Sequence, residues 1–239
     1  RFIGDAVGPT LIAVGSIHGN EPSGRLALER VATFLRKTSA AIRGRVFLLA
    51  GNVQASEDEV RFIDSDLNRH WTHDNIARNA VTPRTGFNLA EDREQHDLLR
   101  HFREILRSAE DEVYVLDLHS TSAGGAPFAT VGDTMRNRRF AMCFPVNILL
   151  GIEEQLDGTM LEFLNNEGAV TLGFEGGQHA ASSSVENHEA LVLTSLVHSG
   201  IVRRADLPGY DGFMKRLAYS TGHARLIEVR HREAITASD

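Results

Sequence analysis

Apolar runs and amphipathic segments alternate along this chain. Five short runs are almost entirely apolar and predict strands buried on both faces, at residues 10–17, 45–50, 113–118, 146–150 and 169–174. Between and after them, apolar side chains recur at helical spacing over residues 26–35, 88–109, 156–164 and 185–197. A last short strand is expected at residues 226–229. The alternation predicts an α/β fold, a three-layer mixed sheet with helices on both faces.

One long stretch carries neither pattern. Residues 70–86 are polar and include Pro83, so we expect a surface loop there. The chain contains no internal repeat and no low-complexity tract. Its 239 residues suffice for one large α/β domain or two small ones, and we expect a single domain over residues 1–239.

Composition and charge narrow the range of partners. The formal net charge is −7, which gives no electrostatic reason to expect nucleic acid or an anionic membrane surface. No apolar run approaches the ~18 residues needed to span a bilayer. Cys143 is the only cysteine and excludes an intrachain disulfide, so a reducing compartment, the cytoplasm, is the simpler expectation. Because it lies between Met142 and Phe144, we interpret it as a small core residue.

Candidate metal ligands follow the carboxyl ends of two predicted strands. His18 and Glu21 come after the first strand and His119 after the third, and open α/β sheets bind ligands at this edge. Two imidazoles and a carboxylate suit a divalent metal such as zinc and leave a fourth position open for water. Asp117 lies on the same side of its strand as His119 and could orient that ring. The structural alternative is that Glu21 complements a helix dipole and His18 is a loop histidine.

The segment between these two groups supplies cationic and amide side chains. Arg61 could polarise a carbonyl group or stabilise a developing oxyanion. Asn68 and Arg69 could together hold a substrate carboxylate. The alternative is a solvated loop, because arginines beside Asp64 and Asp66 often form only weak surface ion pairs.

Glu175 is the candidate for proton transfer. It follows the predicted strand 169–174 and precedes two glycines, which allow a ligand or backbone to approach closely. A metal-activated water needs a carboxylate that takes its proton and passes it to the leaving nitrogen. Glu153 and Glu154 compete for this role but resemble ordinary acids in the first turn of a helix. His179 is a further candidate for the pocket wall, and Ser120 lacks the G-x-S-x-G setting of a serine hydrolase.

Together, these motifs resemble the succinylglutamate desuccinylase/aspartoacylase family, which belongs with the zinc carboxypeptidase-like hydrolases. The matching segments run in order from about residue 11 to 178 and include HGNE at 18–21, GN at 51–52, RFIDSDLNR at 61–69, DLH at 117–119 and FEG at 174–176. The resemblance implies a zinc carboxypeptidase-like fold and one zinc ion per chain, held by His18, Glu21 and His119. It further implies roles for four residues: Glu175 as general base and acid, Arg61 at the scissile carbonyl, and Asn68 with Arg69 on the substrate carboxylate.

The chain departs from the family pattern in two places. Family members usually carry a further β-rich domain after the catalytic one, and this sequence ends at Asp239, soon after the last predicted strand. The family's usual proline after the catalytic glutamate is replaced, because Gly176, Gly177 and Gln178 follow Glu175.

The predicted function is that of a zinc-dependent amidohydrolase that removes a succinyl or acetyl group from an N-acyl amino acid. Its partner is then a small anionic molecule with a free carboxylate, with neither nucleic acid nor membrane involved. Three alternatives stay open at this point: a metallocarboxypeptidase acting on short peptides, a metal-binding module without catalysis, and an α/β domain whose histidines coincide by chance.

Overall fold

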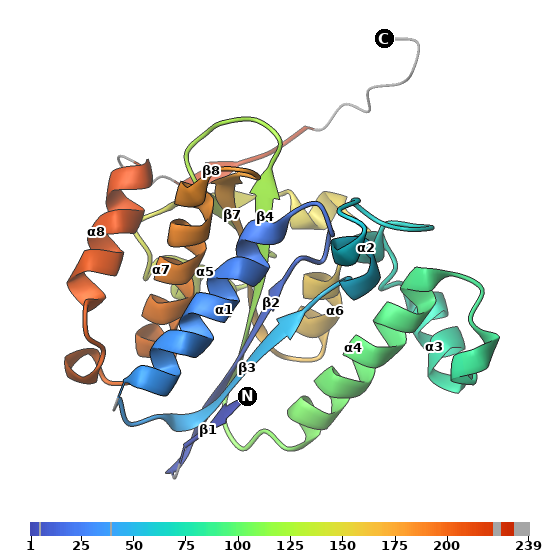
Figure 1. Cartoon of the computed structure of the whole chain (residues 1–239), viewed down its shortest axis with the longest axis horizontal. Coiled ribbons are helices and arrows are strands. Elements are labelled where there is room, and N and C mark those ends of the chain that lie inside the picture. Colours follow the sequence, from blue (N-terminus) through green and yellow to red (C-terminus); the bar gives the residue numbers. More distant parts are fainter. Residues whose placement is uncertain (5, 39, 222–225, 232–239) are drawn as a thin grey trace.

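A mixed sheet runs through the computed structural model, which describes residues 1–4, 6–38, 40–221 and 226–231 (Figure 1). Within these residues, eight strands pair in the order β1-β3-β2-β4-β7-β5-β6-β8. The strands are β1 (Phe2–Ile3), β2 (Ala6–Gly15), β3 (Arg43–Ala50), β4 (Val113–Thr121), β5 (Phe128–Thr130), β6 (Asn147–Leu150), β7 (Val170–Gln178) and β8 (Leu226–Glu228). The central strands β3, β2, β4 and β7 are mutually parallel, whereas β5 runs antiparallel to β7. Their carboxyl ends therefore share one edge of the sheet.

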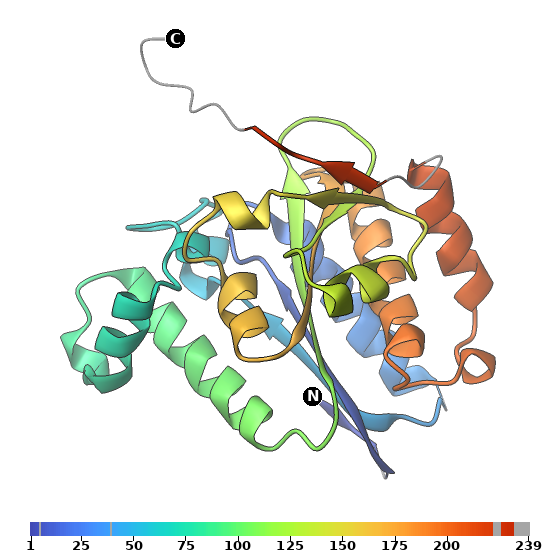
Figure 2. The ribbon, with the colours of Figure 1, turned by 180° about the vertical axis from the view of Figure 1, so that it is seen from behind.

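Helices cover both faces of this sheet. On one face, α1 (Pro22–Lys37), α7 (Ser182–His198) and α8 (Tyr210–Thr221) pack side by side (Figure 1). On the other lie α4 (Ala90–Arg107) and α6 (Met160–Asn166) (Figure 2). The shorter elements are α2 (Val53–Glu57), α3 (His73–Val81), α5 (Met135–Ala141) and the 3-10 turns η1 (Leu67–Arg69), η2 (Arg84–Gly86), η3 (Glu153–Gln155) and η4 (Arg204–Asp206). In the part of the chain described here, every helix is too short or too polar for a membrane crossing.

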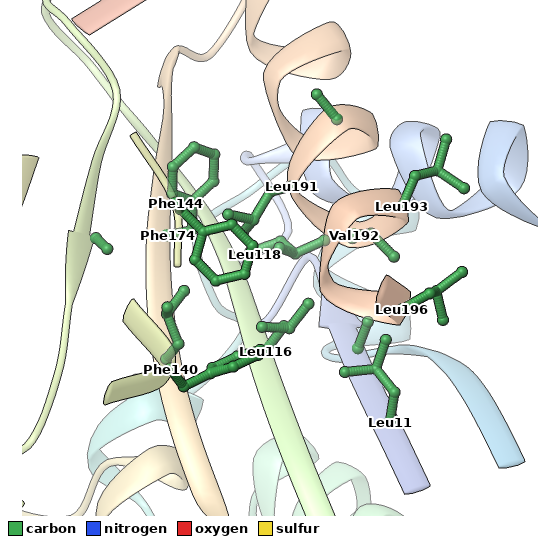
Figure 3. Packing of buried hydrophobic residues seen from close by; sticks show 14 of the residues in the cluster. Leu11, Leu116, Leu118, Phe140, Phe144, Phe174, Leu191, Val192, Leu193 and Leu196 are labelled. Atoms are coloured by element: carbon green, nitrogen blue, oxygen red, sulfur yellow. The ribbon is translucent and has the colours of Figure 1, made fainter. Parts of the chain in front are cut away.

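The side chains of β2 explain why its sequence is apolar without interruption. Successive residues of a strand point to opposite faces of the sheet. Leu11 and Ala13 enter the hydrophobic cluster under α1 and α7, whereas Ile12 and Val14 enter the cluster under α4 and α6, and all four are fully buried. Figure 3 shows the first cluster, where residues of β4 and β7 meet Leu191 and its neighbours on α7. The predicted α/β sheet with helices on both faces is thus confirmed.

The prediction of a long surface loop at residues 70–86 is wrong. Residues 73–81 form α3, and Thr72 caps it by accepting a hydrogen bond from the backbone N–H of Asn75 (3.3 Å). Its apolar contribution to the core is small, since Ile76 alone of this helix packs against the second cluster. Polar contacts with α4 replace the missing apolar stripe, and a hydrophobic pattern cannot reveal such contacts.

Asp92 is the centre of this polar contact between α3 and α4. Its buried carboxylate accepts hydrogen bonds from Nε2 of His70 (2.8 Å), Nη2 of Arg78 (2.8 Å), Nδ2 of Asn79 (3.1 Å) and the backbone N–H of Leu89 (3.3 Å). Burial by itself would raise the pKa of Asp92, but these donors together lower it to about 2. The ionised carboxylate therefore stabilises the folded protein.

Asp92→Asn is expected to lower the free energy of unfolding at pH 7 by about 2 kcal/mol, since each pKa unit corresponds to ~1.4 kcal/mol. The folded-state pKa lies below the ordinary value of 3.8, so the stabilisation is present above pH 3.8 and is lost as the pH falls through about 2. Urea denaturation of both proteins at pH 7 and at acid pH measures this. The difference should narrow in acid, and an equal difference at both pH values would contradict the assignment.

Candidate active site

The strand order brings three distant segments to one edge of the sheet. β4 lies between β2 and β7, and the Cα atoms of His119 and Glu175 are register partners on these neighbouring parallel strands. Leu118 and Phe174 point into the first hydrophobic cluster, so His119 and Glu175, one position later, point to the opposite face. Both side chains line the same cavity, which has a volume of about 450 Å³.

The turn between β2 and α1 is tightly built. Ser16 adopts a left-handed backbone conformation (φ 59°), and its hydroxyl donates a hydrogen bond to the carbonyl of Glu21 (3.0 Å). Gly24 brings the start of α1 against β4, because a Cβ there would lie 2.7 Å from the carbonyl oxygen of Leu118. Strained backbone of this kind persists where the surroundings fix it, often at functional sites. The turn places His18 and Glu21 at the edge of the sheet where the carboxyl ends of the parallel strands lie.

Glu21 connects the two histidines. Its Oε1 lies 2.9 Å from Nδ1 of His18, and its Oε2 lies 3.2 Å from Nδ1 of His119. The backbone N–H of Ser120 also donates to Oε2 (2.9 Å). Potential ligand atoms of the three side chains all lie within 4.8 Å of one another. Residues 18, 21 and 119, which the sequence predicts as metal ligands, therefore converge.

The opposite nitrogen of each ring faces a carboxylate. His18 Nε2 lies 3.1 Å from Oδ1 of Asp66, and His119 Nε2 lies 2.9 Å from Oδ2 of Asp117. Metal-bound histidines commonly have this pairing, because a carboxylate on one nitrogen fixes the ring and directs the other toward the metal. The two Nδ1 atoms are thus oriented toward Glu21, and the donor set fits a divalent cation such as zinc. The prediction that Asp117 contacts the ring of His119 agrees with this geometry.

The charges of this cluster are strongly coupled. Burial alone would raise the pKa of Glu21, but hydrogen bonds and charge from His119 and His18 hold it well below its usual range. Burial alone would lower the pKa of His119, but Asp117 and Glu21 together raise it well above its usual range. The buried carboxylates of Glu21 and Asp117 therefore require positive charge close to His119. A metal cation satisfies the same requirement, which is the electrostatic condition for a binding site.

Glu175 differs from Glu21 because its carboxyl group lacks comparable partners. Its Oε2 is buried without a hydrogen-bond partner in the part of the chain that the structure describes. Burial raises the pKa of Glu175, an effect that the positive charge of His119 reduces only in part. Directly after it, β7 contains one extra residue relative to β4, and Gly177 has φ +127° there. This bulge requires a glycine and ends the regular pairing beside the cavity.

The segment of residues 61–69 reaches the cavity, and its polar side chains have different hydrogen-bond partners there. The half-exposed guanidinium of Arg61 contacts Oε1 of Glu21 (3.4 Å) and Oδ2 of Asp66 (3.0 Å). Asn68 is buried, its Oδ1 accepting from the backbone of Met160 (2.9 Å) and its Nδ2 donating to Asp117 (3.3 Å). Arg69 lines the cavity and donates from Nη1 to the carbonyl of Asn68 (2.6 Å). Asn68 therefore bridges two segments of the chain. Both Asn68 and Arg69 line the cavity, and their joint role as a clamp for a substrate carboxylate stays a prediction.

Glu91 holds this segment in place, a role that sequence reasoning missed. Its fully buried carboxylate accepts hydrogen bonds from the side chain of Asn52 (3.0 Å) and from the backbone N–H groups of Ile63 (2.8 Å), Asp64 (3.0 Å) and Ser65 (3.1 Å). Burial would raise the pKa of Glu91, but these donors lower it. A helix acid is ordinary in sequence, and only the fold shows that a loop wraps around it.

Three further residues lie in the cavity wall or directly beside it. His179 lines the cavity as expected, with Nδ1 2.8 Å from the hydroxyl of Ser120. Asp66 pairs with Arg61, as the solvated-loop alternative expects, and in addition contacts His18. Glu153 is an acid in the first turn of a short helix, as predicted, because it opens η3 before α6. It also lines the cavity, which its sequence position does not indicate.

Asp66→Asn is expected to weaken zinc binding by about 10–100-fold, since partners of ligand histidines typically contribute this much. The variant removes the negative charge that faces Nε2 of His18 while leaving all three ligands in place. Isothermal titration with zinc measures the change. Asp64→Asn is the matched control. The carboxylate of Asp64 accepts a hydrogen bond from the backbone N–H of Ala90, and this contact involves no ligand histidine. Equal affinities for the wild type and Asp66→Asn would contradict the assignment.

The class that the sheet and its helices define is that of α/β proteins with a zinc carboxypeptidase-like fold, and the His-Glu-His cluster lies at the carboxyl edge of this sheet. The sequence matches the succinylglutamate desuccinylase/aspartoacylase catalytic domain over residues 7–196. The chain therefore belongs to this family of deacylase hydrolases, as the motif resemblance predicts. The sequence matches no curated protein.

Solved structures of similar fold come from several bacteria. A succinylglutamate desuccinylase/aspartoacylase from Rhodobacter sphaeroides superposes with a TM-score of 0.65 at 21% identity, covering 95% of this chain and 64% of that one. The succinylglutamate desuccinylase of Chromobacterium violaceum gives 0.68 at 17% identity, with 95% and 71% covered. The product-bound ectoine utilization protein of Ruegeria pomeroyi gives 0.67 at 19% identity, with 96% and 65% covered. The chain thus spans about two thirds of the length of these proteins, and at such identities the likeness concerns the fold.

Proposed function

We propose that this chain is a zinc-dependent amidohydrolase that removes an acyl group, of succinyl or acetyl type, from an N-acyl amino acid. The observation that carries the proposal is the position of Glu175. Its buried, incompletely partnered carboxyl group lines the same cavity as the His-Glu-His cluster and is the register partner of His119. A cation site with an adjacent base of raised pKa suits metal-assisted hydrolysis of an amide.

His18, Glu21 and His119 are the residues that would hold the zinc ion, one per chain. Their Nδ1 and carboxylate atoms face one another, and Asp66 and Asp117 fix the rings from behind. When bound, zinc would polarise the scissile carbonyl and lower the pKa of a coordinated water toward ~7. Three protein ligands leave a position for that water.

The side chains of this chain then divide the remaining work. Glu175 takes a proton from the attacking water and delivers it to the departing nitrogen, a cycle favoured by a pKa that burial moves toward neutrality. Arg61, half-exposed beside Glu21, donates to the carbonyl oxygen as negative charge develops there. Arg69 and Asn68 on the cavity wall bind the free carboxylate of the substrate. Asn68 fixes the position of Arg69 through the contacts that join η1 to α6.

The test is an activity screen of the zinc-loaded protein. Succinyl-, acetyl- and formyl-amino acids are compared with dipeptides carrying the same C-terminal residues, and release of the free amine is measured. Hydrolysis of the N-acyl amino acids in preference to dipeptides supports the proposal. Preferential cleavage of dipeptides would identify a carboxypeptidase, and the absence of hydrolysis with zinc bound would indicate a metal-binding module.

The remaining expectations concern the setting of the enzyme. We propose a reducing compartment, the cytoplasm, because Cys143 is half-buried against the first hydrophobic cluster and is the only cysteine of the chain. The proposed partner is a small molecule with a free carboxylate, and a cavity of about 450 Å³ is within the size range of small-molecule sites.

A further inference from the structure

One carboxyl group in the cavity has no part in the mechanism above. Glu153 projects from η3 so that its Oε1 lies 3.7 Å from the point that a Cβ on Gly173 would occupy. Gly173 precedes Glu175 by two residues on β7, so both face the same side of the sheet, about 7 Å apart along the strand. The hydroxyl of Thr130 fills most of the space that Gly173 leaves open, and Glu153 lies beside it. The carboxyl group of Glu153 is thus placed two residues along the strand from the proposed base.

The contacts of Glu153 come from hydroxyl groups. Thr130 Oγ1 donates to its Oε1 (2.9 Å), and Thr159 Oγ1 lies at 3.5 Å from its Oε2. Burial raises the pKa of Glu153, and the hydrogen bond from Thr130 offsets this only in part. Across the described ranges of the chain, no lysine, arginine or histidine forms an ion pair with it, whereas Glu21 and Asp117 both face histidines. A carboxylate withdrawn from water in this way favours a positively charged partner.

The wall beside Glu153 is apolar. Ile152, Leu156 and Leu161 line the same cavity, and Leu161 Cδ1 lies 3.3 Å from the same Cβ point over Gly173. Methylene groups pack well on such a surface while a charged end reaches a polar group beyond it. The combination suits a short aliphatic chain that ends in a cation.

We propose that Glu153 selects substrates whose amino acid carries a cationic side chain, so that the substrate class is N-acyl derivatives of basic amino acids. This inference rests on the proposed function and specifies its substrate. The α-carboxylate lies on Arg69, the amide lies between the His-Glu-His cluster and Glu175, and the aliphatic side chain follows Leu161 to Glu153. The cation belongs to the amino acid, because simple acetyl, succinyl and formyl groups carry none.

The test compares substrates of similar shape that differ in charge. Nα-acetylornithine, N-acetylnorvaline and N-acetylglutamate are assayed with the wild type, Glu153→Gln and the control Glu154→Gln, in which an exposed neighbour is changed. We expect the wild type to favour the ornithine derivative over the norvaline derivative by at least about tenfold in kcat/KM. Glu153→Gln should abolish this preference, chiefly by raising KM for the ornithine derivative, and Glu154→Gln should behave as the wild type.

Calorimetric binding of ornithine and norvaline provides a readout independent of turnover. A protein that hydrolyses none of the substrates but binds ornithine more tightly through Glu153 would refute the proposed function and retain the cationic subsite. A protein that hydrolyses N-acyl amino acids but prefers norvaline or glutamate derivatives would overturn the inference and leave the proposed function intact. An ornithine preference that persists in Glu153→Gln would also overturn it.

Discussion

Glu175→Gln is expected to lower kcat by about 10²–10⁴-fold, because general acid–base catalysis contributes on this order, while the protein still binds one zinc ion per chain. The amide is nearly isosteric with the carboxylate but accepts no proton at neutral pH. Glu175 Oε2 has no hydrogen-bond partner among the described residues, so the substitution removes no contact of that atom. Stopped assays of amine release and metal analysis of the same sample measure the two quantities.

The control for this variant is Glu154→Gln, which makes the same chemical change at an exposed site outside the cavity lining. It should retain the wild-type kcat and metal content. If Glu175→Gln kept substantial activity, another group would have to transfer the proton. If it lost zinc as well, Glu175 would belong to the metal site rather than act beside it.

His119→Ala is expected to reduce zinc content to a small fraction of one ion per chain and activity to background. A three-ligand site that loses one imidazole retains too few donors to hold the ion. The change also leaves Glu21 and Asp117 as buried carboxylates without the imidazole that both of them contact. Metal analysis after gel filtration measures the loss of zinc, and far-ultraviolet circular dichroism checks that the fold survives.

His73→Ala is the matched control for the ligand variant. The side chain of His73 is 97% exposed at the start of α3, so its loss should change neither zinc content nor turnover. Unchanged zinc stoichiometry in a folded His119→Ala protein would show that the ion binds elsewhere. A similar loss of zinc in His73→Ala would show that the wild-type zinc is held adventitiously on surface histidines.

The buried strands could be predicted because they are apolar on both faces. Ile12 and Val14 contact one cluster while Leu11 and Ala13 contact the other, so the sequence of β2 is apolar throughout. The alternation of strands and helices along the chain then indicated a parallel sheet and the edge at which such sheets bind ligands. Helix α3 escaped prediction since its stability depends on Asp92, a residue of another helix, and not on an apolar face of its own.

The residues of the candidate site could likewise be predicted only in part from the sequence. His18, Glu21 and His119 could be predicted to converge because each follows or ends a strand, and strand order brings them together. Asp66 and Glu153 could not be assigned from sequence. Both look like surface acids, and their contacts with His18 and Thr130 arise only when loops far apart in sequence fold against the sheet edge. The burial of a charged residue depends on tertiary structure that local patterns do not encode.

If residues 18, 21 and 119 hold a catalytic divalent ion, activity must depend on that ion. The rate of amine release from N-acyl amino acids by the wild type is therefore measured before chelation, after chelation, and after zinc is returned. Activity should disappear with the metal and return when about one equivalent of zinc per chain is added. Activity that survives complete removal of the metal would contradict this role for the three residues.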